Sequence, residues 1–257
     1  MKNKVMHKMF VLSDVHGYYN EMKTALDAAG FDPNNESHYC VVLGDFYDRG
    51  PDPTNVMKYL MDLPRKVLIR GNHDNLMVQL CERGFPYSYD KSNGTLRTVW
   101  QLGLALDLDD CYEIALNRVK PFFNQMVNYF ETKNYIFVHS WVPLINKDGL
   151  PAHYTRDRKF EFNPDWRNAS QKDWDDAMWG NPFNMAENGF LPDKTIVFGH
   201  WHASAGWAKA EGRSEFGEDA KFDPYYGDGF ISIDACTAHS CKVNVLVLED
   251  EFLEDLL

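Results

Sequence analysis

Five short apolar runs in this sequence each end in a cluster of aspartate, histidine or asparagine residues. The runs read MFVLSDVHG, HYCVVLGDFYDRG, KVLIRGNHD, YIFVHSW and TIVFGHWH. Each run is typical of a short buried β-strand because it is rich in Val, Ile, Leu and Phe. In α/β proteins, sites form where loops leave the carboxyl ends of strands. These polar clusters are therefore expected to meet at one edge of a sheet, although they lie far apart in the sequence.

Helical periodicity follows the first three runs, so strands and helices alternate in the first third of the chain. Strands are expected at 8–13, 38–43 and 66–69, and amphipathic helices at 19–29, around 56–61 and from residue 74 onward. Gly30 is suited to closing the first helix because glycine adopts the left-handed conformation that ends many helices. The alternation predicts mostly parallel strand pairing with right-handed crossovers.

Three regions interrupt this alternation and are interpreted as insertions that frame or cover the site. They span about 75–132, 143–192 and 203–228. The first is predicted to hold several helices, including 95–105 and 119–131, and no clear strand, whereas the third is expected to be an exposed loop. GFISIDA and KVNVLVLED then resemble a closing hairpin, and the acidic tail EDEFLEDLL a frayed helix. Without a repeat or a linker, residues 1–257 are predicted to form a single domain.

The composition is that of a globular enzyme, with 14% aromatic residues and a formal net charge of -12. Such a charge should repel nucleic acid and anionic membranes, and neither is expected as a partner. A phosphorylated substrate stays compatible with it, because bound cations invert the local field. The five cysteines form no CxxC pair and are expected to be reduced thiols. With no signal peptide or apolar run of membrane length, a cytoplasmic location is expected.

The clusters that follow the apolar runs offer a mixed set of oxygen and nitrogen ligands without a thiolate. The candidate ligands are Asp14, His16, Asp45, Asn72, His139 and His200. Such a set favours two divalent transition metal ions, with Mn, Fe, Zn, Co and Ni all left open, over an oxygen cage for Ca or Mg. Two such cations would lower the pKa of a shared water from about 16 toward about 7 and neutralise charge on a phosphoryl group. The sequence thus favours a metal-activated attack of water on phosphorus.

The other polar residues at the strand ends fit roles in the same reaction. Arg49 and Arg70 stand beside the ligands, and their guanidinium groups suit bidentate capture of phosphate oxygens. His73 is placed to protonate the leaving alkoxide, and Asp48 could hold its imidazole in the required tautomer.

Each motif taken alone has an ordinary structural explanation. Asp48-Arg49-Gly50 could be a surface ion pair in a turn, Asn72 could cap a helix, and His139 could be a hydrogen-bonded structural residue. The occurrence of all of them in order, each after an apolar strand, makes a metal site the better interpretation.

The motifs resemble those of the calcineurin-like metallophosphoesterases, and within them the phosphoprotein phosphatase branch. They stand here as SDVHG (13–17), GDFYDRG (44–50), GNHD (71–74), VHS (138–140) and GH (199–200). The resemblance implies an α/β (α+β) fold, a four-layer α/β/β/α sandwich of two mixed sheets with helical and loop insertions. It also implies that Asp14 and His16 bind the first metal, Asp45 bridges both, and Asn72, His139 and His200 bind the second. The acid and its orienting carboxylate correspond to His73 and Asp48, and the phosphate-binding arginines to Arg49 and Arg70.

The sequence departs from the branch in several places. Ser13 replaces a glycine, Asp74 replaces a glutamate, and Ser140-Trp141 stands where small residues often follow the histidine. His202 completes a GHxH that is similar to the wider phosphodiesterase branches, so it is a candidate ligand of the first metal. The branch's further phosphate-binding arginine has no clear match, and its candidates are Arg156, Arg158 and Arg167.

The sequence therefore predicts a dinuclear-metal phosphomonoesterase, most of all a serine/threonine protein phosphatase acting on a phosphorylated protein or a small phosphate ester. Hydrolysis of a dinucleoside polyphosphate such as diadenosine tetraphosphate is the closest alternative, and a phosphodiesterase, suggested by His202, comes third. A non-catalytic scaffold on the same fold is the alternative of another class. It is disfavoured because such proteins usually lose metal or acid residues, and all of them are present here.

Overall fold

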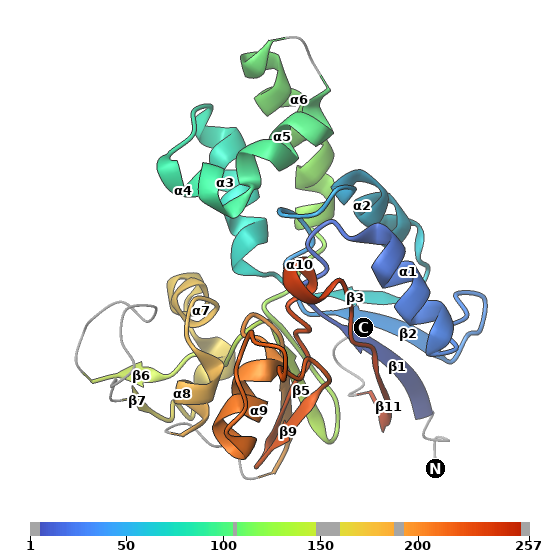
Figure 1. Cartoon of the computed structure of the whole chain (residues 1–257), viewed down its shortest axis with the longest axis vertical. Coiled ribbons are helices and arrows are strands. Elements are labelled where there is room, and N and C mark those ends of the chain that lie inside the picture. The colour runs from blue at the N-terminus through green and yellow to red at the C-terminus, as the bar shows by residue number, and fades with distance from the viewer. Residues whose placement is uncertain (1–5, 105–106, 148–159, 188–192, 253–257) are drawn as a thin grey trace.

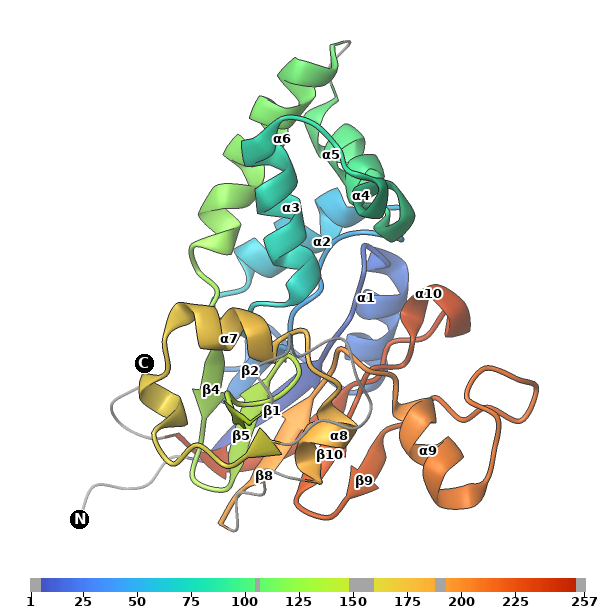
Figure 2. The ribbon, with the colours of Figure 1, turned by 90° about the vertical axis from the view of Figure 1, so that its left-hand side faces the viewer.

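The computed structural model describes residues 6–104, 107–147, 160–187 and 193–252, and it contains two sheets that pack face to face (Figures 1 and 2). The first sheet has the order β11-β1-β2-β3, with β1 (Met6–Leu12), β2 (His38–Val42), β3 (Lys66–Leu68) and β11 (Leu246–Glu251). The second has the order β4-β5-β8-β10-β9, with β4 (Tyr129–Glu131), β5 (Tyr135–Val138), β8 (Thr195–Phe198), β9 (Tyr225–Gly227) and β10 (Phe230–Ser232). A small ladder joins β6 (Ile145–Asn146) and β7 (Phe160–Glu161).

Helices cover the outer faces of both sheets. On the side of the first sheet lie α1 (Tyr19–Ala28), α2 (Pro53–Asp62), α3 (Asn72–Arg83), α4 (Ser88–Asn93), α5 (Thr95–Gly103) and α6 (Leu108–Phe123). On the side of the second lie the 3₁₀ helix Trp166–Asn168, α7 (Gln171–Ala177), α8 (Pro182–Ala186) and α9 (Ala203–Glu211), and a short α10 (Thr237–Ser240) lies between the two halves. Helices α3 to α6 project beyond the sandwich in both views.

Alternation along the strands produces this layering. In β1, Phe10 and Leu12 pack against the helices, whereas Met9 and Val11 point into the core between the sheets. There they meet apolar side chains of the second sheet, such as Val197, and the opposite face of that sheet packs against α7 and α8. The expected four-layer α/β/β/α sandwich is therefore confirmed.

Parallel pairing brings the strand ends to one edge, as expected. Strands β1, β2 and β3 run parallel in the first sheet, and β5, β8 and β10 run parallel in the second. Each of these strands ends in a loop that carries a polar residue of the candidate site. The single-domain division with three insertions stays a prediction.

The helix expected at 119–131 is wrong in its second half. Helix α6 ends at Phe123, with Pro121 in its last turn, and residues 129–131 form β4. The backbone of Val127 bonds to Leu68 and Arg70, so pairing with the sheet overrides the helical pattern there. The exposed loop expected at 203–228 is likewise corrected, because it contains α9 and β9.

The closing hairpin is also wrong. Strand β10 pairs with β8 and β9, whereas β11 pairs antiparallel with β1 in the other sheet. The apolar side chains of Ile231 and Leu246 both enter the core between the sheets, so the two strands face one another across the sandwich instead of pairing. Glu249–Glu251 of the expected tail helix extend β11, and residues 253–257 lie outside the described part of the chain.

Within the described residues, no helix combines the length and the apolar character that a membrane span requires.

Candidate active site

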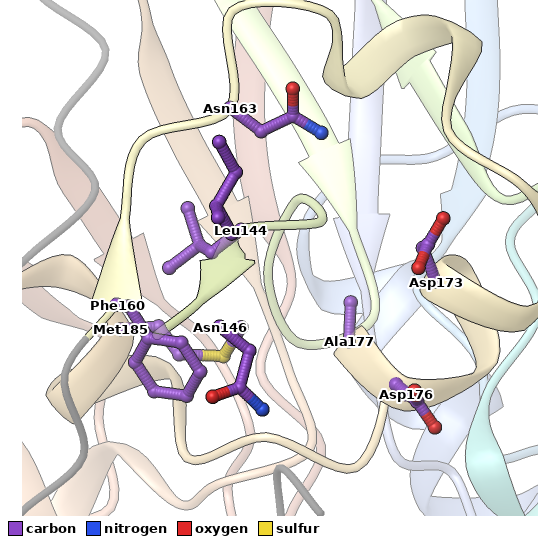
Figure 3. A pocket seen from close by; sticks show the side chains of 9 residues that line it. Leu144, Asn146, Phe160, Asn163, Asp173, Asp176, Ala177 and Met185 are labelled. Atoms are coloured by element: carbon purple, nitrogen blue, oxygen red, sulfur yellow. The ribbon is translucent and has the colours of Figure 1, made fainter. Parts of the chain in front are cut away.

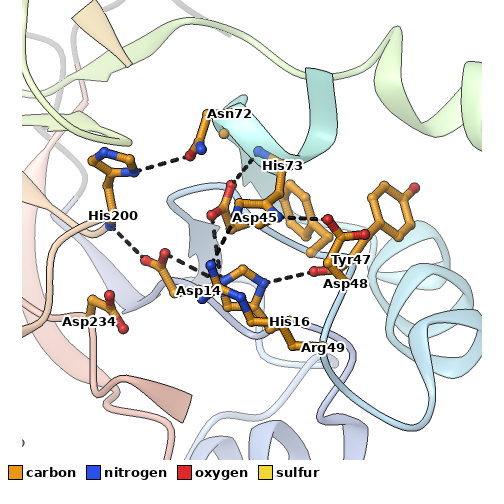
Figure 4. Close-up of polar contacts among 12 residues, drawn as sticks. Asp14, His16, Asp45, Tyr47, Asp48, Arg49, Asn72, His73, His200 and Asp234 are labelled. Carbon is orange, nitrogen blue, oxygen red and sulfur yellow. Dashed lines mark hydrogen bonds and ion pairs between the residues drawn. The ribbon is translucent and has the colours of Figure 1, made fainter. Parts of the chain in front are cut away.

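The residues that follow five strand ends converge on one buried cluster at the edge of the two sheets (Figure 4). The cluster contains Asp14, His16, Asp45, Asp48, Asn72, His73, His139 and His200. Most of these polar side chains are almost completely buried; Asp14, His16, Asp45 and Asn72 are each 2% exposed. Burying so many polar and ionisable groups together is unfavourable unless they bind one another or a cation.

The backbone around the cluster is held in conformations that non-glycine residues rarely adopt. Asp14, His16, Asp45 and His200 have φ values of 49°, 47°, 57° and 62°, in the left-handed region. Such strain persists at functional sites where the surrounding structure fixes it. Here Asp74 helps to fix it, because its carboxylate accepts hydrogen bonds from the backbone N–H groups of Asp45, Phe46 and Gly71. This aspartate, where the resembling family has glutamate, thus joins two of the loops.

Glycine is required where these loops approach each other. A Cβ on Gly44 would lie 2.6 Å from backbone atoms of Gly71 and 2.8 Å from Nδ1 of His139. At φ +85°, Gly44 also has a conformation that side chains rarely tolerate. The close approach brings Asp45 and Asn72 to the same point.

One set of donor atoms, called the second donor set because it corresponds to the second metal, is arranged around Asn72. Its Oδ1 lies 2.8 Å from Nε2 of His139 and 3.0 Å from Nδ1 of His200, and Oδ1 of Asp45 lies 3.5 Å from Nε2 of His139. Atoms that bind one cation at about 2.1 Å are separated from one another by about 3–3.5 Å. These four side chains therefore fit a single divalent cation.

The first donor set, which consists of Asp14, His16 and Asp45, shares Asp45 with the second. The other carboxylate oxygen of Asp45, Oδ2, lies 3.6 Å from Nε2 of His16, which is 4.0 Å from Oδ1 of Asp14. The two oxygens of Asp45 thus face different neighbours, as a carboxylate that bridges two cations requires. The arrangement matches the ligand division that the resemblance implied, which stays a prediction.

Backbone carbonyl groups select the histidine tautomers. Nδ1 of His16 lies 2.8 Å from the carbonyl oxygen of Tyr47, and Nδ1 of His139 lies 2.7 Å from that of Leu43. Because a carbonyl oxygen can only accept, both Nδ1 atoms carry the proton and both Nε2 lone pairs point into the cluster. This is the tautomer that a metal ligand needs.

Burial and mutual repulsion shift the pKa values of these ligand candidates toward the neutral form of each group. Burial and the nearby Arg49 hold the pKa of His16 well below its usual value, and burial together with His139 lowers the pKa of His200 to about 3. Both imidazoles are therefore neutral near pH 7. Burial and repulsion from Asp234 and Asp45 raise the pKa of Asp14 well above its usual value. A cation would reverse that shift, so the donor set fits a dinuclear divalent centre.

His73 lies beside the first set, within 4.8 Å of ligand-type atoms of His16 and Asp45. Its Nδ1 lies 2.6 Å from Oδ2 of Asp48, so the proton at that nitrogen is held by a carboxylate. The guanidinium of Arg49 donates to Nε2 of His73 and of His16, at 3.0 Å in each case. His73, Asp48 and Arg49 therefore lie together at the edge of the cation sites.

Helix α5 of the first insertion holds Asp48, the partner of His73, in place. Two threonines of α5 donate to the carboxylate of Asp48, Thr95 Oγ1 to Oδ2 at 2.7 Å and Thr98 Oγ1 to Oδ1 at 3.0 Å. The backbone N–H of Asp48 donates in turn to Thr98 Oγ1 at 3.1 Å. The sequence contains no signal for these contacts, because α2, β3, α3 and α4 lie between Asp48 and the two threonines.

Two of the expected site residues lie elsewhere. The guanidinium of Arg70 stacks over Phe123, 4.5 Å from the ring centroid, and lines a separate cavity beside Trp174. His202 is not part of the cavity lining; it lies near Asp234, and its Nδ1 is 3.0 Å from a carboxylate oxygen of Glu215.

Of the three candidates for a further phosphate-binding arginine, the one that belongs to the described part of the chain lies away from the cluster. Arg167 forms a bidentate pair with Glu131. Arg156 and Arg158 lie outside the described residues.

Sequence reasoning missed Asp234, which lies beside Asp14 in Figure 4. It follows β10 and is 4% exposed, and its Oδ1 accepts from the backbone N–H of Cys236. Burial raises its pKa, and the nearby His202 and Arg49 oppose that shift. FISID ends an apolar run in an acid, the same signal as the other five clusters, and interpreting it as part of a hairpin concealed it.

The cluster forms the floor of a cavity of about 250 Å³. Arg49, Asn93, Trp179 and Trp201 complete its lining. A second cavity of about 360 Å³ lies against α7 and α8 (Figure 3). It is lined by residues such as Leu144, Phe160 and Asp176 and brings no histidine to a carboxylate, so the chemistry of the molecule belongs to the first cavity.

Comparison with known proteins agrees with this geometry. The chain is 39% identical over 66 residues to a symmetrical bis(5'-nucleosyl)-tetraphosphatase of Buchnera aphidicola, and 35% identical over 71 residues to that of Wigglesworthia glossinidia brevipalpis. These matches cover 25% and 27% of this chain and 23% and 25% of the relatives, so the chain matches only about a quarter of their length.

Solved structures share the fold at low sequence identity. A putative diadenosine tetraphosphatase superposes with a TM-score of 0.54 at 17% identity, covering 96% of this chain and 95% of the other. A cold-active protein-tyrosine phosphatase of a psychrophilic Shewanella species superposes with a TM-score of 0.53 at 14% identity, covering 94% and 75%.

The sequence profile of one family matches residues 7–204, which is more than half of the chain and contains every candidate ligand except Asp234. Members of that family generally use a dinuclear divalent metal site, and the donor sets around Asp45 suit one. The chain belongs to the calcineurin-like phosphoesterases.

Proposed function

We propose that this protein hydrolyses dinucleoside polyphosphates such as diadenosine tetraphosphate. The observation that carries the proposal is the pair of donor sets sharing Asp45, with His73 and Asp48 at their edge. The curated relatives that match the chain are symmetrical bis(5'-nucleosyl)-tetraphosphatases, which favours this substrate over a phosphoprotein. A serine/threonine protein phosphatase is the second candidate, because the GDFYDRG and GNHD motifs also occur in that branch.

Six side chains would hold the two cations. In this proposal Asp14 and His16 bind the first, Asp45 bridges, and Asn72, His139 and His200 bind the second. When bound, the cations supply Lewis acidity to the phosphoryl oxygens and lower the pKa of coordinated water. Their identity among Mn, Fe, Zn, Co and Ni stays open.

His73 is proposed as the general acid. The carboxylate of Asp48, 2.6 Å from Nδ1, stabilises the protonated imidazole and keeps its ring fixed. In the structure Nε2 accepts a hydrogen bond from Arg49. Once Arg49 turns to the substrate phosphate, a protonated Nε2 would deliver its proton to the leaving oxygen. His73 is 4% exposed and Asp48 is 1% exposed, so water competes weakly for that proton.

Arg49 is proposed to bind the substrate phosphate. Its two terminal nitrogens already reach Nε2 of His16 and Nε2 of His73, so the guanidinium lies between the first donor set and the acid. A planar fork in that position can bind two phosphoryl oxygens at once. Arg70 and His202 have no role in this proposal, because their side chains lie outside the cavity.

We propose a cytoplasmic location for the reaction. All five cysteines are free in the structure, and the three in the core, Cys40, Cys81 and Cys111, are buried as small apolar side chains. This usage is typical of a reducing compartment.

The test is turnover of three substrates side by side with added Mn²⁺: diadenosine tetraphosphate, a phosphoserine peptide and an aryl phosphodiester. We expect the dinucleotide to give the highest kcat/KM. Preference for the peptide would instead support the second candidate, and preference for the diester a phosphodiesterase. A purified chain that binds no transition metal and gains no activity with Mn²⁺ would support the scaffold and overturn the enzyme.

A further inference from the structure

The rim of the catalytic cavity carries two tryptophans, Trp179 and Trp201, that the reaction itself does not use. Both are half-buried, whereas Trp141, Trp166 and Trp174 are packed in the core. An indole that lines a polar, charged cavity contributes little to the metal site. It does offer a flat apolar surface to a ligand.

Trp201 is fixed to the second donor set. It directly follows His200, and the centroids of the two rings are 6.2 Å apart at an interplanar angle of 63°. The backbone N–H of Trp201 donates to the carbonyl of Gly199 at 2.6 Å, and the backbone carbonyl of Trp201 accepts a hydrogen bond of 3.2 Å from the hydroxyl of Ser232. The indole is therefore held at the side of the cavity where His200 lies.

Trp179 is tied to the same side through a different segment. The backbone carbonyl of its neighbour Gly180 accepts a hydrogen bond of 2.8 Å from the hydroxyl of Ser140, which follows the ligand His139. The backbone of Trp179 continues the end of α7 by donating to Asp176 at 3.3 Å. Each tryptophan is thus connected through its own chain segment to one histidine of the second donor set.

We propose that Trp179 and Trp201 form a stacking site for a nucleobase of the substrate, next to the cation that Asn72, His139 and His200 would hold. The inference depends on the proposed function and names the residues that select its substrate. A nucleobase stacks on an indole without any charge, so the acidic chain presents no barrier to it. A phosphoserine side chain has no ring for these surfaces.

The test compares binding of adenosine 5'-monophosphate with binding of ribose 5-phosphate, which carries the same phosphate without the base. Calorimetry on the Mn²⁺-loaded protein should show that the nucleotide binds at least about tenfold more tightly. Trp179→Leu and Trp201→Leu should each weaken nucleotide binding about tenfold and leave ribose 5-phosphate unchanged. The control is Trp100→Leu, since Trp100 lies on α5, is 53% exposed and is not part of the cavity lining.

Three outcomes would overturn the stacking site. The first is that adenosine 5'-monophosphate and ribose 5-phosphate bind equally well. The second is that the nucleotide binds equally well to all variants. The third is that Trp179→Leu and Trp201→Leu weaken the binding of phosphotyrosine more than the binding of the nucleotide. The last would assign the indoles to an aryl phosphate. The result is separate from the proposed function, because a protein that binds the base through both tryptophans and yet fails to turn over the dinucleotide would refute only the latter.

Discussion

At the scale of single residues, the site combines groups proposed to bind cations with one pair proposed to transfer a proton. His73 lies within reach of the first donor set, so a variant must distinguish an acid from a ligand. Its Nδ1 is already engaged by Asp48, and its Nε2 by Arg49. A carboxylate partner at Nδ1 is typical of an oriented acid, whereas Nδ1 of His16 and Nδ1 of His139 each contact a backbone carbonyl oxygen.

We predict that His73→Asn lowers kcat by at least about 100-fold, the usual contribution of a general acid, and leaves the metal content unchanged. Steady-state kinetics and elemental analysis of the purified variant check both halves. Loss of one or both metals in the variant would show that His73 is a ligand.

Asp234 provides a second prediction at this scale. Its carboxylate is buried next to Asp14, so it adds negative charge at the first donor set without itself belonging to the two groups of close donor atoms. We predict that Asp234→Asn weakens Mn²⁺ binding about tenfold, as outer carboxylates of metal sites usually do. Calorimetric titration of the metal-free protein measures this.

The matched control is Asp250→Asn. Asp250 is equally buried, at 1% exposure, but its carboxylate binds Thr132 and Asn134 away from the site. Equal loss of metal affinity in both variants would mean that Asp234 acts through general stability.

At the scale of elements, the strand ends carry the candidate ligands, and one inserted helix contacts the partner of the proposed acid. The parallel strands bring the ligands together, and α5 positions the acid through Thr95 and Thr98. The double variant Thr95→Val with Thr98→Val should lower kcat at least about tenfold while KM and metal content change little, since a buried charge loses two donors. Kinetics at saturating substrate test this.

A matched control for the threonine variant exists in the same fold. Thr132→Val removes a hydroxyl that donates to the buried carboxylate of Asp250 at 2.7 Å, far from the cluster. It should lower stability by a similar amount and leave kcat unchanged. If both variants reduce kcat alike, orientation of Asp48 is not the cause.

The sequence could predict what lies at the strand ends and could not predict contacts that depend on the insertions. Ligands at strand ends could be predicted, because a short apolar run identifies a strand and parallel pairing determines where its end lies. The positions of Asp45 and Asn72 could be predicted without any further information. The direction of the Arg70 side chain could not be predicted, because it depends on Phe123 in an insertion. The hairpin failed because alternation shows that a strand is half-buried without showing which sheet it joins.

At the scale of the whole molecule, the cations would connect segments from Asp14 to His200 that belong to both sheets. Metal binding should therefore stabilise the fold as a unit. At a Mn²⁺ concentration of about 100 times Kd we expect about 2.7 kcal/mol of added stability, which raises Tm by roughly 5–10 °C. In Asp45→Asn, which lacks the charged bridge, the rise should be largely lost; an equal rise in both proteins would contradict a shared centre.

The pH dependence of the metal-free protein tests how deeply the site is buried. Burial and the neighbouring His139 lower the pKa of His200 to about 3, whereas the unfolded chain has the ordinary value near 6.5. Between these values the unfolded state binds a proton that the folded state does not, so the free energy of unfolding decreases as the pH falls below about 6.5. The slope for one such group is at most about 1.4 kcal/mol per pH unit.

Other groups contribute with the opposite sign, because burial raises the pKa values of Asp14 and Asp74 and makes the folded state hold protons to higher pH. The contribution of His200 is therefore isolated by comparison with His200→Asn in urea unfolding at pH 7.5 and pH 5.0, with a chelator present. The wild-type protein should lose more stability on acidification than the variant, and His38→Asn, remote from the cluster, should behave as wild type. Identical losses in wild type and His200→Asn would mean that His200 accepts its proton in the folded protein as readily as in the unfolded chain. That result would contradict the hypothesis that His200 is a buried, neutral ligand.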